Sequence, residues 1–192
     1  MTRKTRQRKA SPRAAASREA ARPVQTQFRG LRGAPTAREA AALVLPGRCE
    51  RPSLRDRQQR YEAMVEELKD QYKIHVRRWR KAMSGVAYEL RFRDGRIKRL
   101  ITAPKPRSPV SAAIFLHEVG HHAIGFKRYQ PRCLEEYYVW QWALREMLAR
   151  GIPVTPRVLR HYRRSMFHYA RRANQPGHHL PREVEPFREW PG

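Results

Sequence analysis

The residues with the clearest chemical potential lie in one short stretch, His117-Glu118-Val119-Gly120-His121. Residues four apart lie on one face of an α-helix, so the imidazoles of His117 and His121 would point at a common spot and bind one zinc ion. Glu118 is turned by about 100° around the same helix, so its carboxylate would reach a water on the metal rather than the metal itself. The pattern predicts a zinc-activated water with Glu118 as its general base.

The other interpretation of this stretch is a buried helix that holds two hydrogen-bonded histidines and a glutamate. Apolar residues surround the motif on both sides, so the helix is expected to be buried. Burying Glu118 without a role would be costly, because a carboxylate loses its hydration in an apolar environment. We therefore favour a metal site.

A catalytic zinc ion usually has three protein ligands, so a third must come from outside the motif. Glu135 and Glu136 lie 14 and 15 residues after His121, which leaves room for one loop and a returning helix. Two adjacent residues cannot both face the ion, and the spacing slightly favours Glu136 while leaving Glu135 open. A more distant histidine is the alternative, and four are available: His161, His168, His178 and His179.

Three other side chains have different expected roles. His122 points about 100° away from His121, so we expect it on the helix surface or behind the metal ligands. His75 lies in a strand pattern and is expected to be a surface or structural residue. Tyr138 belongs to an aromatic run that is most simply core, but it is also our candidate donor to a developing oxyanion.

The elements that position these residues are predicted from caps, turns and apolar spacing. Ser53 and Ser108-Pro109 are typical helix starts, and Asp94-Gly95 is typical of a two-residue hairpin. Together they predict an α+β fold in which a small antiparallel sheet of about three strands packs with about four helices, the motif lying on a central one. The expected helices are 53–72, 108–125, 133–150 and 157–173, and the expected strands are 72–76, 86–92 and 96–102.

Charge and composition divide the chain of 192 residues into three parts. Residues 1–52 form a basic segment predicted to be disordered, 53–173 form the domain that carries the motif, and 174–192 form a proline-rich segment expected to be extended. The net charge is +25 and the pI about 11.4. Such a surface attracts polyanions, so nucleic acid is a candidate partner for the N-terminal segment and the last helix. The competing interpretation is a general arginine bias of the genome.

The cysteines, the apolar runs and the N-terminus indicate where in the cell the protein is expected. Cys49 and Cys133 are far apart and form no C-x-x-C pair, which argues against a zinc ribbon or a disulfide scaffold. The sequence contains no run of about 18 apolar residues, so no transmembrane helix is expected. The basic N-terminus lacks an apolar segment typical of a secretory signal. These features together predict a cytoplasmic protein.

With these motifs in place, residues 60–150 resemble the minimal zincin metallopeptidases, most closely the ImmA/IrrE-like family. The resemblance rests on His117-Glu118-Val119-Gly120-His121 and on Glu135-Glu136 ahead of Trp142-Ala143. In that family the glutamate commonly stands five residues before the alanine, a position that Tyr138 occupies here. The resemblance implies an α+β fold and a zinc-dependent endopeptidase, often a regulatory one that cleaves a transcription repressor.

Three functions therefore remain open from the sequence. The first is a gluzincin-like zinc metallopeptidase with Glu118 as general base and a protein or peptide substrate. The second is a nucleic-acid-binding protein whose zinc site is structural or vestigial. The third is a hydrolase that uses the same site on a substrate other than a peptide.

Overall fold

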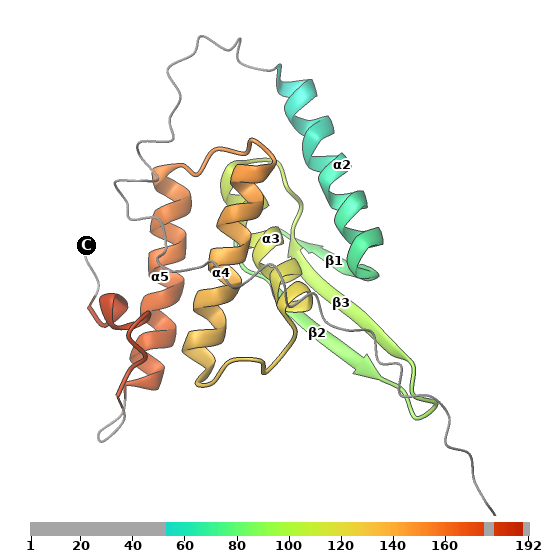
Figure 1. Ribbon diagram of the computed structural model, residues 1–192. Helices are drawn as coiled ribbons and strands as arrows, with labels where there is room; N and C mark the ends of the chain where they lie inside the picture. Colours follow the sequence, from blue (N-terminus) through green and yellow to red (C-terminus); the bar gives the residue numbers. More distant parts are fainter. Residues whose placement is uncertain (1–52, 175–178, 190–192) are drawn as a thin grey trace, which may run out of the picture. The chain divides into compact units, whose positions relative to one another are not determined.

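The computed structural model describes residues 53–174 and 179–189 (Figure 1). The predicted basic segment 1–52, Cys49 and His178 lie outside the described residues. The fold class is α+β, as predicted. The elements follow in the order α2 (Leu54–Tyr72), β1 (Ile74–Arg80), β2 (Val86–Arg91), β3 (Ile97–Pro104), α3 (Pro109–Ile124), α4 (Arg132–Ala149), α5 (Pro156–Ala173) and the short 3-10 helix η1 (Glu185–Phe187).

The helix that carries the motif, α3, begins and ends where the sequence predicts. The Ser108 hydroxyl accepts a hydrogen bond from the Ser111 amide at 3.3 Å, and Pro109 occupies the first turn, where its missing N–H costs nothing. Gly125 follows the last turn with φ +94°, a conformation that favours glycine. The motif therefore lies in the C-terminal half of a helix whose two ends are fixed locally.

The three-stranded sheet is mixed, so the prediction of an antiparallel sheet is wrong for β1. The hairpin at Asp94-Gly95 pairs β2 with β3 antiparallel, but β1 pairs with β3 in parallel, in the order β1-β3-β2. Turn chemistry determines only the hairpin pair, whereas the place of β1 depends on the route of its connection to β2. That connection, residues 81–85, passes the end of β3, because Arg80 lies opposite Pro104 and Val86 opposite Thr102.

Helix α3 lies at the centre of the described domain. It packs on β3 and β2 on one side and on α4 on the other, and it also contacts α2 and α5. Phe115 and Leu116 have no exposed surface, and His117 to His122 are all buried. The sequence therefore places the motif at the junction of sheet and helices, where its polar side chains are shielded from water.

The C-terminal segment differs from the expected extended tail. Residues 179–189 form turns and η1, and Leu180 and Val184 are buried in the hydrophobic core. The ring of Phe187 lies 5.4 Å from that of Tyr162 on α5, measured between centroids. Figure 1 shows η1 beside this helix. Apolar residues spaced among the prolines cover the aromatic side of α4 and α5, a packing that local composition does not predict.

Within residues 53–174 and 179–189, no helix is both long and apolar enough to cross a bilayer.

The contact between α3 and α4 leads to a first prediction, at Gly120. A Cβ atom there would lie 3.0 Å from the Trp142 ring and 3.1 Å from the Val139 side chain. Gly120→Val should lower the free energy of unfolding by about 1–3 kcal/mol, the usual cost of overpacking. Urea denaturation followed by circular dichroism measures this. The matched control is Ala63→Val on the exposed side of α2, which should cost less than about 1 kcal/mol. Equal losses in the two variants would contradict a tight contact at Gly120.

Candidate metal centre

His117, His121 and Glu136 come together between α3 and α4. Their donor atoms all lie within 4.8 Å of one another, and all three residues are buried. The Nε2 atom of His117 is 3.2 Å from Glu136 Oε2, and that of His121 is 3.6 Å from Glu136 Oε1. The helical spacing of the two histidines and the packing of α4 thus place two imidazoles and one carboxylate around a common point.

The state of these polar atoms fits a metal ion. Both Glu136 oxygens are fully buried, and neither accepts a hydrogen bond of ordinary geometry, although Arg132 lies within ion-pair distance of Oε1. Buried carboxylates normally have hydrogen-bond partners, so atoms left in this condition are rare in folded proteins. Two imidazoles with one carboxylate form a donor set that suits zinc and related divalent ions. The triad could therefore hold a metal ion through His117, His121 and Glu136.

The adjacent glutamate takes a position behind the triad. Glu135 Oε1 lies 3.9 Å from Nδ1 of His121, beyond hydrogen-bond distance, whereas Nε2 of the same ring is 3.6 Å from Glu136. Arg132 reaches both carboxylates, with its guanidinium 2.7 Å from Glu135 and 2.5 Å from Glu136. A carboxylate behind a metal-binding histidine orients the ring and increases its basicity. The structure thus separates the two glutamates that the sequence left open.

The electrostatic environment keeps two of these groups in the form that binds metal. Burial lowers the pKa of His121 to about 3, with His117 contributing, so the imidazole is neutral at pH 7. Burial would raise the pKa of Glu136, but the approach of His117 and the charge of Arg132 outweigh it and lower the value to about 2. Glu136 is therefore an anion over the whole physiological range.

Glu118 faces a cavity that one member of the triad, His117, also lines. The cavity has a volume of 470 Å³, and His117, Glu118 and Trp140 form part of its wall. Burial raises the pKa of the Glu118 carboxyl to about 7, and His117 opposes that rise. Gly85 closes one side, since a Cβ atom there would lie 2.6 Å from the Glu118 Cδ. The loop 81–85 therefore fits against the side chain of Glu118 only because residue 85 is glycine.

Helix α5 forms the opposite wall, which the sequence motif did not reveal. His161, Ser165, His168 and Tyr169 line the cavity from this helix. Burial raises the pKa of Tyr169, and the nearby Glu136 adds to the rise. The regular apolar spacing of 157–173 predicted a packed helix, but nothing in it indicated that this helix reaches the motif.

The aromatic ring of Trp140 supports the first histidine. Its centroid lies 4.3 Å from that of His117, and the two planes are inclined by 30°. The indole Nε1 donates a hydrogen bond of 3.2 Å to the Ser165 hydroxyl on α5. Trp140 thereby links the motif helix to α5 through α4. The sequence placed it only in the aromatic run around Tyr138, which is most simply core.

The other predicted residues lie away from the triad. Tyr138 does not line the cavity, and its ring packs 4.3 Å from Tyr129 between centroids. His122 is buried rather than on the helix surface, with Nε2 3.2 Å from the Leu100 carbonyl of β3. His75 is exposed, as expected, and His179 is exposed outside the triad. His161 and His168 reach the cavity without joining the metal group.

The comparisons leave the family open. No protein-family model, no curated protein and no solved structure matches this chain.

A second prediction distinguishes the two glutamates. We expect the full chain to bind one zinc ion, and Glu136→Gln to weaken that binding by more than about 100-fold because a ligand is lost. Glu135→Gln should weaken it only by roughly 10- to 100-fold, the effect of losing an orienting carboxylate. Competition with a chromophoric chelator measures both affinities. His75→Ala is the control and should bind zinc like the original protein. A larger loss in Glu135→Gln than in Glu136→Gln would assign the ligand to Glu135.

Proposed function

We propose that the protein is a zinc-dependent metallopeptidase. The observation that carries the proposal is a cavity lined by Glu118 and by His117, which belongs to a buried two-histidine, one-carboxylate triad. A general base next to an open metal site is the arrangement that peptide hydrolysis needs. When bound, zinc supplies Lewis-acid chemistry: it lowers the pKa of water and polarises a carbonyl oxygen.

The residues of this chain divide the remaining tasks. His117, His121 and Glu136 hold the ion, and Glu135 with Arg132 orients those ligands. Glu118 takes a proton from the attacking water and passes it to the departing amine. Helix α5 lines one side of the cavity and limits the access of bulk water to these groups, which strengthens their interactions. Tyr169 is better placed than Tyr138 to donate to a developing oxyanion, because it lines the cavity.

A peptide substrate would bind along strand β2. This strand is at one edge of the sheet, and it begins at Val86, directly after the glycine that faces Glu118. An extended peptide can add to such an edge through main-chain hydrogen bonds. This mode would bring a scissile bond to the cavity without requiring particular side chains.

Membership of the ImmA/IrrE-like family and a regulatory role are parts of the same proposal. Their support is the motif on α3 and the glutamate on the following helix, in an α+β domain with a small sheet. Activity on a transcription repressor would follow from that membership.

The third prediction concerns Glu118→Gln. This variant should bind zinc but hydrolyse peptides with a kcat roughly 10²- to 10⁴-fold lower, because the amide cannot accept the proton. Quenched fluorescent peptides cut by the original protein provide the assay. Gly85→Ala is a milder probe: the added methyl group would displace the Glu118 side chain and lower kcat while the metal ligands stay in place. Full proteolysis by Glu118→Gln would exclude it as the base.

Nucleic-acid binding is a second candidate function, favoured by the exposed arginines of α5. Arg163, Arg171 and Arg172 lie on this helix outside the cavity. We expect duplex DNA to bind with an affinity that falls steeply as salt rises, because bound arginines release counterions from phosphate. Fluorescence anisotropy at several salt concentrations tests this. Binding that is absent, or insensitive to salt, would remove the second function.

A further inference from the structure

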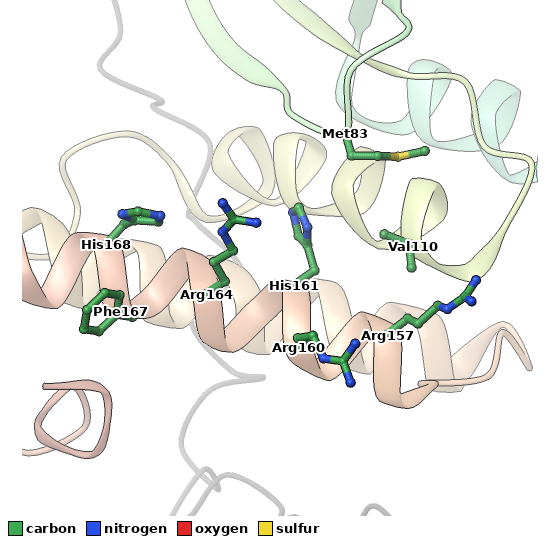
Figure 2. Close-up of a pocket in the computed structure, with 8 residues that line it drawn as sticks. All are labelled: Met83, Val110, Arg157, Arg160, His161, Arg164, Phe167 and His168. Carbon is green, nitrogen blue, oxygen red and sulfur yellow. The ribbon is translucent and has the colours of Figure 1, made fainter. Parts of the chain in front are cut away.

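A larger groove continues from the cavity of the candidate metal centre. It has a volume of 650 Å³ and shares Met83, His161, Arg164 and His168 with that cavity. Beyond them it extends along the first turns of α5 to Arg157 and Arg160. Figure 2 shows the side chains of His161 and Arg164 rising from α5 towards the segment that carries Met83. A polymer bound at the metal centre would therefore have a path along this groove.

The cationic side of the groove follows from the periodicity of α5. Its buried residues Val158, Tyr162, Met166 and Ala170 recur at every fourth position and fix the helix against the core. Arg157, His161, Arg164 and His168 recur at intervals of four, three and four, so they form a second stripe on one face. That stripe is the one that lines the groove.

The arginines of the groove have no acidic partners. Helix α5 contains no aspartate or glutamate, and none of the residues that line the larger groove is acidic. Within the part of the chain that the structure describes, Arg157, Arg160 and Arg164 form no ion pair, and all three are exposed. Of the buried carboxylates near the motif, Glu135 and Glu136 pair with Arg132, and Glu118 lines the adjoining cavity. The groove thus presents uncompensated positive charge next to the candidate metal centre.

We propose that this groove selects acidic polypeptide substrates, binding aspartate or glutamate side chains beside the bond to be cut. The inference rests on the proposed metallopeptidase function and names its substrate class. Continuity with the cavity favours a polypeptide, because its reacting bond and its acidic side chains then occupy one path. The apolar surfaces of Met83 and Val110, which face α5, suit the stems of peptide side chains.

The dimensions of the stripe fit a short acidic motif. Arg157 and Arg164 are seven residues apart on α5, which corresponds to about 10 Å along the helix axis. A peptide in the polyproline II conformation covers that distance in about three residues, and its three residues per turn return every third side chain to the same face. Two acidic residues that are three positions apart would therefore meet both arginines at once.

The test compares two fluorescent peptides that differ only in charge. One carries two glutamates three positions apart, and the other carries glutamines at the same positions. We expect the zinc-loaded full chain to bind the acidic peptide roughly tenfold more tightly at about 150 mM salt, where long-range attraction by the net charge is screened. Arg157→Gln combined with Arg164→Gln should abolish this preference in fluorescence anisotropy.

The matched control removes the same charge outside the groove. Arg163→Gln combined with Arg172→Gln should leave the preference for the acidic peptide intact, since these residues do not line the groove. Equal loss in both double variants would overturn the proposal in favour of a nonspecific charge effect. If duplex DNA displaces the peptide, and only the groove variant binds that DNA more weakly, the groove is a nucleic-acid site and the proposal is overturned.

Cleavage of the same two peptides separates this inference from the proposed function. Equal kcat/KM values for the acidic and neutral peptides would overturn the acidic preference while leaving the metallopeptidase in place. Groove-dependent binding of the acidic peptide without cleavage of either peptide would support the groove and contradict the peptidase.

Discussion

His117, His121 and Glu136 can share one ion only if α3 and α4 approach closely along the faces that carry them. Gly120 makes that approach possible, because it lies three residues after His117 and has the side chains of Trp142 and Val139 against it. The metal-binding face of α3 is thus also its packing face. The residues between the two histidines bring α4, and with it Glu136, to the correct distance.

This close approach carries an electrostatic cost. Glu118, Glu135 and Glu136 are all buried within one region, and each is at most 5% exposed. Arg132 lies within ion-pair distance of only the second and third, and about half of its own side chain is exposed. Clusters of buried charge seldom add stability, because desolvation offsets their attraction. Their presence at the centre of a small domain is more readily explained by chemistry than by folding.

The features that were predictable from the sequence are those fixed by neighbouring residues. Ser108 and Gly125 determine the ends of α3, Asp94-Gly95 determines the hairpin, and helical spacing brings the two histidines together. The parallel direction of β1 was not predictable, because it depends on how the loop 81–85 crosses the end of β3.

Contacts between elements that are far apart in the sequence were not predictable either. Glu136 was favoured over Glu135 only slightly, since the choice depends on the rotation of α4 against α3. Tyr138 was chosen for its proximity to the predicted ligands, but that same rotation turns it towards Tyr129. Tyr169 reaches the cavity because α5 packs across α4, and 33 residues of chain separate it from Glu136.

Net charge alone is a poor guide to what such a protein binds, because +25 attracts every polyanion. The position of each arginine in the structure says more about what the protein binds. The buried stripe of α5 orients the helix, so Arg157 and Arg164 fall on the wall of the groove and Arg163 falls outside it. Arginines of one helix therefore belong to two different surfaces, one continuous with the candidate metal centre and one separate from it. A charge that contributes to specificity here must lie on the first surface, where it meets the substrate that the centre would act on.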